Sequence, residues 1–379
     1  MASRTEQLLQ LGQSVWMDFI RRGHLASGEF DRLVKEHGIV GVTSNPTIFR
    51  EAIAESDDYD SGIERLVGRG LAGGALFDAL AVEDIQSACD RLLPIFERSK
   101  GMDGRVSIEV NPHLAGDSLG TIAEARRLHG LVGRVNLHVK VPATPAGLPA
   151  ITALIAEGIC INVTLIFSLA RYEEVMDAYL RGLEERAKQQ LALASTHSVA
   201  SFFVSRVDSK VDRAIDQRIG SLKPGAAGRG ELEAVRGKAA VANARLAYQR
   251  FKRIFASDRF RALQAKGAHP QRPLWASTST KDPKYRDVVY VEELIGPQTV
   301  NTMPLATIDA FNDHGVVEAR LERDLDAARD LFKRLPELGV PVEKLIGELE
   351  QEGVDKFAQS YDALLDALKS KRSAIQGTR

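Results

Sequence analysis

Short apolar runs alternate with longer stretches of helical periodicity along the whole chain. Eight of these runs end in polar turns that contain Gly or Pro, and such runs are typical of strands. The predicted strands span residues 14–20, 38–43, 105–110, 135–141, 159–167, 198–204, 273–277 and 299–303. Strands that alternate with helices indicate a parallel sheet with crossover connections. This pattern fits both a doubly wound sheet and a closed barrel. The number of predicted strands, eight, favours an α/β fold of the (β/α)8 TIM-barrel type.

Helical periodicity fills the stretches between the predicted strands. Residues 81–98 place apolar side chains at helical spacing, and similar patterns predict helices over 169–193, 231–255 and 318–334. Residues 221–230, Ser-Leu-Lys-Pro-Gly-Ala-Ala-Gly-Arg-Gly, predict a flexible loop between two of these regions.

Two connections, residues 46–104 and 207–272, are longer than the others. Both contain helical patterns, so we expect helical insertions within a single domain that spans residues 1–379. We expect residues 315–379 to form a C-terminal helical extension of that domain, with residues 370–379 frayed.

Polar residues interrupt the apolar pattern of several predicted strands on one face. Parallel strands are usually apolar on both faces, because helices cover one side and the barrel interior the other. The residues expected to face inward are Asp18 in the first strand, Ser107 and Glu109 in the third, Asn136, His138 and Lys140 in the fourth, Asn162 and Thr164 in the fifth, and Ser201 and Phe203 in the sixth. Lys140 stands just before the turn at 142–147, so we expect it at the carboxyl end of the barrel, where barrel enzymes place their chemistry.

A lysine and two carboxylates that converge inside a barrel indicate a reaction centre. A single inward Ser or Thr fits a satisfied core hydroxyl, but Lys, Asp and Glu are almost never fully buried unless paired. A purely structural buried ion pair gains little over apolar packing. Burial disfavours a lysine's ammonium form and lowers its pKa, which favours an amine that forms a Schiff base with a carbonyl. Because nearby carboxylates can move protons to and from hydroxyls, Lys140, Asp18 and Glu109 indicate an imine-forming aldolase or transaldolase.

The composition excludes several other classes of protein. Lys plus Arg is 50 and Asp plus Glu is 51, a net charge of −1, so the chain has no basic footprint for nucleic acid or a membrane surface. No apolar run approaches the roughly 20 residues of a membrane helix, and the first residues lack the apolar core of a signal peptide. The two cysteines, Cys89 and Cys160, cannot build a disulfide scaffold or a cysteine zinc site. We therefore expect a cytoplasmic protein.

Cofactor signals are weak in this chain. His113, His129, His138 and His197 lack the close spacing of a metal site, so no metal is expected. No glycine-rich phosphate loop of the Walker or dinucleotide type is present either, so the sequence implies no organic cofactor.

Two segments resemble signatures of the transaldolase family. Residues 41–49, Gly-Val-Thr-Ser-Asn-Pro-Thr-Ile-Phe, resemble its first signature. Residues 137–148, Leu-His-Val-Lys-Val-Pro-Ala-Thr-Pro-Ala-Gly-Leu, resemble its second, which contains the Schiff-base lysine. Weaker blocks at 106–110, 161–168 and 201–206 also fit. The resemblance covers about residues 13–309, and the length and long insertions are similar to those of the larger bacterial transaldolases.

The resemblance implies catalytic roles by position. Lys140 forms the imine with the ketose donor. Asp18 accepts and returns the proton of the hydroxyl at the bond that breaks. Glu109 acts through a water held by Thr164 in imine formation and hydrolysis.

The resemblance also implies substrate-binding residues. Asn45 and Asn162 bind the dihydroxyacetone part, Ser201 and Phe203 belong to the matching sixth-strand block, and Arg206 with Ser277 binds the phosphate. A plain surface ion pair between Arg206 and Asp208 is the alternative for that arginine. Many family members carry a second phosphate arginine just after the serine, but residues 275–281, Trp-Ala-Ser-Thr-Ser-Thr-Lys, contain none. Lys281, two residues further on, is the candidate substitute.

The expected activity is therefore transfer of dihydroxyacetone from sedoheptulose 7-phosphate to glyceraldehyde 3-phosphate, giving erythrose 4-phosphate and fructose 6-phosphate. This reaction belongs to the non-oxidative pentose phosphate pathway and implies sugar phosphates as partners, with no nucleic acid or membrane. A fructose 6-phosphate aldolase is an alternative, but such relatives tend to have Tyr where this chain has Phe203, and they lack its insertions. A non-catalytic barrel scaffold would have no reason to keep the inward charged set. The oligomeric state stays open between monomer and homodimer.

Overall fold

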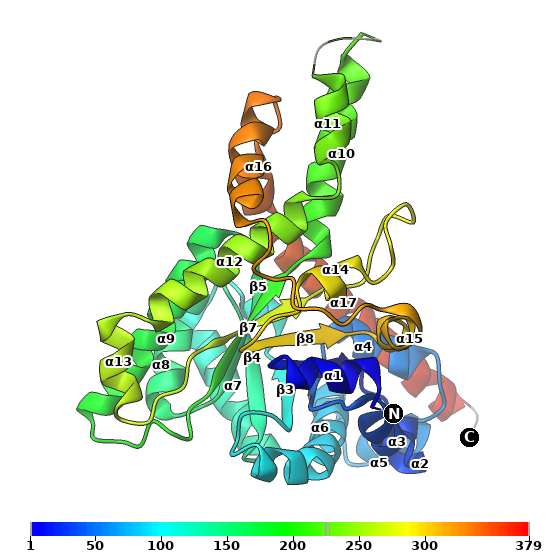
Figure 1. The fold of residues 1–379 in the computed structure, drawn as a ribbon. Coiled ribbons are helices and arrows are strands. Elements are labelled where there is room, and N and C mark those ends of the chain that lie inside the picture. Colours follow the sequence, from blue (N-terminus) through cyan, green and yellow to red (C-terminus); the bar gives the residue numbers. More distant parts are fainter. Residues whose placement is uncertain (1, 224–225, 227, 378–379) are drawn as a thin grey trace.

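Eight parallel strands close into a barrel in chain order (Figure 1). The structure is a computed structural model, and it describes residues 2–223, 226 and 228–377. The strands are β1 (Gln13–Asp18), β2 (Gly41–Thr43), β3 (Arg105–Glu109), β4 (Leu137–Pro142), β5 (Ile161–Ile166), β6 (Ser198–Phe203), β7 (Arg272–Ala276) and β8 (Thr299–Met303). β8 pairs with β1, so the sheet has no free edge. The closed barrel is confirmed, and all eight predicted strands are present.

Helices cover the outside of the barrel and fill the long connections. They are α1 (Arg4–Gln10), α2 (Arg22–Ser27), α3 (Glu29–His37), α4 (Pro46–Ala54), α5 (Asp60–Val67), α6 (Gly73–Arg98), η1 (Pro112–Leu114, a 3₁₀ turn), α7 (Ser118–Val132), α8 (Gly147–Glu157), α9 (Leu169–Lys188), α10 (Ser205–Ser221), α11 (Arg229–Val235), α12 (Ala239–Phe255), α13 (Asp258–Gln264), α14 (Val289–Glu293), α15 (Leu305–His314), α16 (Leu325–Glu337) and α17 (Val342–Gly377). The two long connections are thus helical, as expected, with α4–α6 in one and α10–α13 in the other.

Two predicted helices differ from the structure. The helix predicted over 231–255 is broken into α11 and α12, because Gly237 has a left-handed φ of +71°. A Cβ at Gly237 would lie 2.6 Å from the ring of Tyr285, so the break also makes room for that ring. The helix predicted over 318–334 starts only at Leu325, after Asp324 at φ +51°.

Two boundary predictions also differ. The predicted flexible loop at 221–230 is shorter at both ends, since Ser221 still belongs to α10 and Arg229 begins α11. Pro224, Gly225 and Ala227 lie outside the described residues. The expectation of a frayed 370–379 segment is wrong as far as Gly377, because α17 continues to that residue. Residues 378–379 lie outside the described part.

Large side chains fill the interior of the barrel. Trp16 and His138 are buried there, with ring centroids 5.9 Å apart. A Cβ at Gly41 would lie 2.5 Å from the Trp16 indole, so only glycine at this position of β2 leaves room for that ring. The indole closes the interior below the residues at the carboxyl end of the strands.

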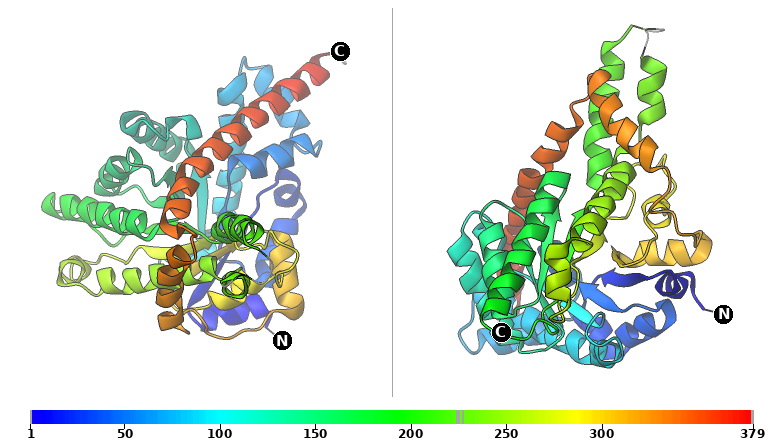
Figure 2. Two further views of the ribbon diagram at one scale, coloured as in Figure 1. Left: turned by 90° about the horizontal axis from the view of Figure 1, so that it is seen from above. Right: turned by 60° about the vertical axis from the view of Figure 1, so that its left-hand side comes forward.

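The last helix, α17, crosses the molecule diagonally (Figure 2). It packs on α4, where Thr47 Oγ1 donates to Ser360 Oγ at 3.0 Å. Further along, Lys371 Nζ lies 2.6 Å from Asp60 Oδ1 at the start of α5. Within the helical extension expected at 315–379, α17 therefore packs against the first insertion.

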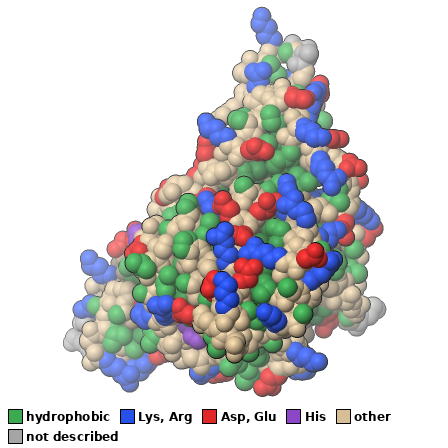
Figure 3. All heavy atoms as spheres, turned by 90° about the vertical axis from the view of Figure 1, so that its left-hand side faces the viewer, with side chains coloured by type: hydrophobic (Ala, Val, Ile, Leu, Met, Phe, Trp, Pro, Cys, Tyr) green, Lys and Arg blue, Asp and Glu red, His purple; other side chains and the backbone are tan. Residues whose placement is uncertain are grey.

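Helices α10 and α11 project away from the barrel, and α16 projects in the same direction (Figures 1 and 2). Together they form the arm of the molecule. Arg334 of α16 pairs with Glu231 of α11 inside it. On the barrel flank seen in Figure 3, basic and acidic side chains are interspersed, in keeping with the net charge of −1. Within the described ranges, no helix combines the length and apolar character needed to cross a bilayer.

Candidate active site

Lys140 and Glu109 form a buried ion pair inside the barrel. The two residues are direct lateral neighbours on β4 and β3, which places both side chains on the inward face. Lys140 Nζ lies 3.2 Å from Glu109 Oε2, and the two side chains are 6% and 7% exposed. Nζ also donates to the backbone oxygen of Ser44 at 3.2 Å. Burial raises the pKa of Glu109, and the attraction of Lys140 only partly opposes this shift.

Asp18, at the end of β1, supplies the second carboxyl group. Its Oδ1 accepts a hydrogen bond from Thr43 Oγ1 at 2.6 Å, and Thr43 is in turn 2.7 Å from the Thr302 hydroxyl. Burial raises the pKa of Asp18, while Lys140, the Thr43 hydrogen bond and Lys281 act to lower it. The structure therefore brings the inward lysine and both carboxyl groups within electrostatic reach of each other, as the strand alternation predicted.

A chain of buried hydrogen bonds fixes Asn162 beside Lys140. Asn162 is the lateral neighbour of Lys140 on β5. Its Nδ2 donates to Ser107 Oγ at 3.1 Å, and its Oδ1 accepts from Ser201 Oγ at 2.7 Å. These contacts fix the orientation of the amide and leave one N–H free for another acceptor. Ser201 is therefore a residue that positions Asn162 in this structure.

Thr164 lies next to an irregularity in β5. The β5–β6 register shifts between Val163 and Ile166, and Leu165 has a left-handed φ of +61°. The Thr164 hydroxyl is buried and has no hydrogen-bond partner in the described part of the chain. Bulges near active sites change the direction of side chains. This bulge adjoins Thr164, the residue whose hydroxyl is predicted to hold a water.

Asn45 starts helix α4. Its Oδ1 accepts from the backbone N–H of Ile48 at 3.1 Å, and Pro46 occupies the first helical position. This is a regular N-cap, which satisfies a backbone donor that the helix leaves free. The cap uses the oxygen and leaves the Asn45 amide N–H groups for a ligand.

Arg206 stands in the first turn of α10, directly after β6. Within the described ranges it forms no ion pair, and burial lowers its pKa. Its guanidinium lies 5.3 Å from the ring centroid of Phe203 and 5.8 Å from that of Phe357. The alternative of a surface pair with Asp208 is wrong, because Asp208 accepts instead from the Ala240 N–H and the Tyr290 hydroxyl. Arg206 is a half-buried cation without a protein anion.

Ser277 and Lys281 come from the segment after β7. Ser277 has φ +57°, and its hydroxyl lies 2.9 Å from Ser205 Oγ, one residue before Arg206. Lys281 Nζ donates to Ser279 Oγ at 2.7 Å. Burial, followed by the charges of Arg206 and Lys356, lowers the pKa of Lys281. Three cations from three different segments thus gather at one place, and Lys356, on α17, was not expected from the sequence.

Hydrogen bonds from two tyrosines join α10, which carries Arg206, to the connection after β7, which carries Lys281. Asp208 accepts from Tyr290 at 2.8 Å and Asp212 accepts from Tyr285 at 2.7 Å. Each aspartate also accepts from a backbone N–H at or just before the start of α12, at 2.7 and 2.9 Å respectively. Burial raises the pKa of Asp208 to about 7. The two halves of the cation cluster are therefore held by one buried network, which sequence analysis missed because its partners lie more than 70 residues apart.

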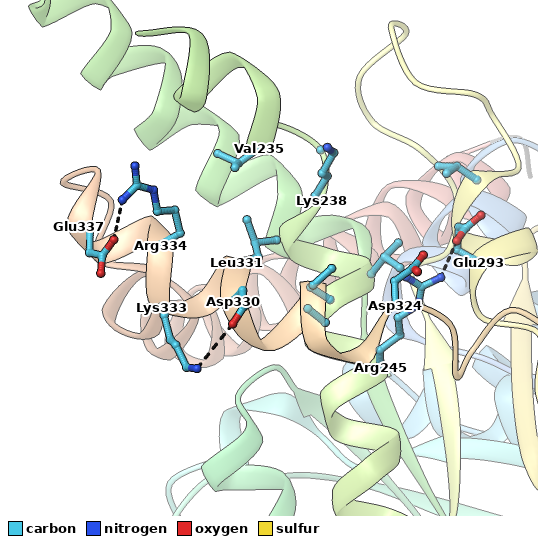
Figure 4. A pocket seen from close by; sticks show the side chains of 16 residues that line it. Val235, Lys238, Arg245, Glu293, Asp324, Asp330, Leu331, Lys333, Arg334 and Glu337 are labelled. Carbon is cyan, nitrogen blue, oxygen red and sulfur yellow. Dashed lines mark hydrogen bonds and ion pairs between the residues drawn. The ribbon is translucent and has the colours of Figure 1, made fainter. Parts of the chain in front are cut away.

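A hollow of about 600 Å³ adjoins this network and reaches Lys281. A larger one, of about 810 Å³, lies on the flank between α12 and α16 (Figure 4). None of the candidate residues lines the larger hollow, and most of its charges pair with each other: Arg245 with Glu293, Arg334 with Glu337, and Lys333 with Asp330. Among the described residues, no group of three or more His, Cys, Asp or Glu is arranged to hold a metal ion.

A buried lysine at the carboxyl end of a (β/α)8 barrel, beside two desolvated carboxyl groups, is typical of barrel enzymes that react through a lysine imine. Comparison with known proteins identifies the family more closely. Residues 15–368 match the family described as Transaldolase/Fructose-6-phosphate aldolase, so the chain belongs to this family.

Similar proteins cover the whole chain. A protein of Thermobifida fusca named Transaldolase is 48% identical over 375 residues, which is 99% of this chain and 100% of the relative. A protein of Frankia alni with the same name is 48% identical over 380 residues, all of both chains. One of Trichodesmium erythraeum, also named Transaldolase, is 45% identical over 372 residues, 97% of this chain and 98% of the relative. The chain is therefore an enzyme of the transaldolase family.

Proposed function

We propose that this enzyme transfers a dihydroxyacetone unit from sedoheptulose 7-phosphate to glyceraldehyde 3-phosphate, with erythrose 4-phosphate and fructose 6-phosphate as products. The observation that supports this proposal most directly is the buried Lys140 amine, 3.2 Å from Glu109 at the carboxyl end of the barrel. The names of full-length relatives agree with it. No metal or organic cofactor enters the proposal.

The proposed reaction starts with the Lys140 amine, which attacks the ketose carbonyl carbon. A proton of the attacking nitrogen passes to the carbonyl oxygen through a water held by Thr164, which gives a carbinolamine. Glu109 then donates, through the same water, the second proton with which this hydroxyl leaves as water, and an iminium ion remains. The raised pKa of Glu109, caused by its burial, suits this role because it makes the protonated form easier to reach than in an exposed glutamate.

Asp18 then takes the proton of the hydroxyl next to the bond that breaks. As this O–H bond opens, the C3–C4 bond of the ketose breaks, the aldose leaves, and the electron pair is held as an enamine on Lys140. The enamine adds to the acceptor aldehyde, whose oxygen takes the proton back from Asp18. A raised pKa brings this carboxyl group closer to working pH, which favours both directions of the transfer.

The remaining residues bind the substrate in this proposal. Asn45 and Asn162 donate amide N–H groups to the dihydroxyacetone hydroxyls. Arg206 and Ser277 bind the phosphate, with Lys281 as a further cation. Arg206 is suited to this because it has no protein anion within the described ranges, so the phosphate does not compete with an existing ion pair.

The proposal also includes a single domain over residues 1–379, of which 315–379 is an extension, and a cytoplasmic location. A fructose 6-phosphate aldolase activity is the second candidate, because the family description includes both activities. Phe203 favours transfer: it is 6% exposed, and its ring lies tilted against that of Phe167 with centroids 5.1 Å apart, an apolar surface without a hydroxyl.

The test is chemical trapping combined with a product assay. Incubation with fructose 6-phosphate and borohydride should add one reduced three-carbon adduct per chain, and peptide mapping should find it on Lys140. Lys140→Ala should abolish labelling, while Lys188→Ala, at an exposed lysine, should not. Labelling of another lysine would overturn the assignment. A coupled assay for erythrose 4-phosphate distinguishes transfer from release of free dihydroxyacetone and from an inactive scaffold.

A further inference from the structure

Helix α17 places one aromatic side chain against the reacting amine. The ring centroid of Phe357 lies 5.9 Å from Lys140 Nζ and 5.8 Å from the guanidinium carbon of Arg206. The side chain belongs to a residue only 6% exposed. One ring therefore contacts both the amine that forms the imine and the cation proposed to bind the phosphate, at distances within the roughly 6 Å range of cation–π contacts.

The packing of α17 explains how Phe357 reaches this position. One turn earlier, a Cβ at Gly353 would lie 3.0 Å from the Leu165 side chain, so the helix approaches the bulged end of β5 closely. On the next turn Ser360 accepts the Thr47 hydrogen bond from α4. These contacts on both sides of Phe357 hold its ring over the barrel rather than toward solvent.

We propose that Phe357 is an active-site residue that stabilises the Lys140 iminium ion and keeps water away from the enamine, so that α17 controls the choice between transfer and hydrolysis. This inference depends on the imine mechanism proposed above. The iminium ion keeps its positive charge on the nitrogen that Phe357 contacts, so a cation–π contact present before reaction persists in the intermediate.

The competing reaction defines what Phe357 prevents. If water reaches the enamine, the carbon that should attack the aldehyde takes a proton from water instead. Hydroxide or a second water then adds to the iminium carbon, the C–N bond breaks, and free dihydroxyacetone leaves while Lys140 regains its amine. An apolar ring over the nitrogen disfavours this route because it excludes water from the site.

Phe357→Leu removes the π face but keeps an apolar side chain. We expect it to raise the ratio of free dihydroxyacetone to transferred product, and to lower the fraction of enzyme trapped by borohydride at subsaturating fructose 6-phosphate. Both effects should be roughly twofold to thirtyfold, the range of one cation–π contact. Phe357→Trp, which retains a π face, should restore the ratio toward that of the parent.

Tyr361→Leu is the matched control. Tyr361 lies one turn further along α17 and contacts Phe77 and His113 rather than Lys140. A merely structural role of Phe357 predicts that both leucine variants lose thermal stability while the product ratio and the trapped fraction stay as in the parent, and this result would overturn the inference.

The two proposals fail in different ways. If the parent enzyme forms no trapped adduct, the imine mechanism itself is wrong. If the parent is trapped normally and Phe357→Leu leaves both the trapped fraction and the product ratio unchanged, only the role of Phe357 is wrong.

Discussion

The two ends of the barrel interior hold buried charges in opposite ways. At the amino end, Arg272 donates to Asp103 at 3.0 Å, to the Met102 backbone oxygen at 2.6 Å and to Ser14 Oγ at 2.8 Å. Ser14 closes the network by donating to the second oxygen of Asp103 at 3.0 Å. Both Asp103 oxygens therefore have partners, while the neighbouring buried Arg105 donates to the Gly101 backbone oxygen.

At the carboxyl end, one amine serves two carboxyl groups. Lys140 contacts Glu109, while Asp18 accepts one side-chain hydrogen bond among the described residues, from Thr43, and burial raises the pKa of both acids. A buried carboxylate that serves only the fold is normally satisfied, as Asp103 is at the amino end. Groups with perturbed pKa values in an unsatisfied cluster are typical of reaction centres. The comparison teaches that the hydrogen bonding of the carboxyl groups, rather than their burial, distinguishes the two roles.

Replacing Asp18 tests the reactive end and has the largest expected effect. Asp18→Asn removes the proton acceptor with little change in shape, so turnover should fall about 10²- to 10⁴-fold. Trapping on Lys140 should persist, because imine formation does not need Asp18. The measurement is steady-state turnover beside borohydride labelling, with the exposed Asp258→Asn as control. Turnover close to that of the parent would contradict the role.

Replacing Asp103 tests the satisfied end. Asp103→Ala leaves the buried Arg272 without its anion, which should lower the free energy of unfolding by about 3–5 kcal/mol. The trapped fraction of the protein that remains folded should be unchanged. The double variant Asp103→Ala/Arg272→Met should recover part of the loss, as measured by urea unfolding. A loss of trapping in folded protein would mean that the two ends are not separate.

Arg206 resembles neither end, because it is a half-buried cation that forms no ion pair with any described residue. Arg206→Ala should weaken binding by about 1.5–3 kcal/mol for each charge-assisted bond lost. The loss should appear mainly in KM for phosphorylated substrates, since the phosphate stays bound through the reaction. Lys281→Ala measures the second cation: a similar rise in KM would show that this lysine replaces the missing arginine. Unchanged binding of fructose 6-phosphate to Arg206→Ala would place the phosphate elsewhere.

Asp208 is an intermediate case, since it is buried and hydrogen-bonded but has no paired cation among its contacts. Its pKa of about 7 lies above the unfolded value of 3.8. Between these two pH values, Asp208 therefore holds a proton in the folded state but not in the unfolded state. This contribution to stability is present at the acidic end of the window and is lost as the pH rises to about 7. Asp208→Asn should remove this slope in urea unfolding measured from pH 5 to pH 8. An identical slope in the variant would contradict the assignment.

Phe203 gives the smallest expected effect. Phe203→Tyr introduces a hydroxyl that can orient water near the enamine, so release of free dihydroxyacetone should rise relative to transfer. The ratio of the two products is the measurement. An unchanged ratio would show that this residue does not set the partition.

The strands and their inward residues could be predicted because a strand has a period of two. That period places Lys140 and Glu109 on the same face, and parallel pairing then brings them side by side. The break between α11 and α12 had one local signal, Gly237 inside the helical pattern. The ring of Tyr285 that requires this glycine is separated from it by almost fifty residues, so its contribution could not be read locally.

The placement of α17 could not be predicted from the sequence. Its periodicity indicates a helix, but the partner of a helix face depends on surfaces made elsewhere in the chain. Lys356 and Phe357 are adjacent in the sequence, but no local pattern predicted that either residue would lie at the active site. The same holds for Tyr290 and Asp208, whose bond depends on how the β7–β8 connection meets the second insertion.

The bond between Thr47 and Ser360 joins residues separated by 313 positions. During synthesis, every barrel strand leaves the ribosome before α17 is made. Until then, the face of α4 that contacts α17 has no helix packed on it. Contacts of such high sequence separation cost loop-closure entropy and form late in folding. A nascent or shortened chain that has closed its barrel but ends before α17 would thus hold Lys140 and Glu109 in register without the Phe357 ring beside the amine.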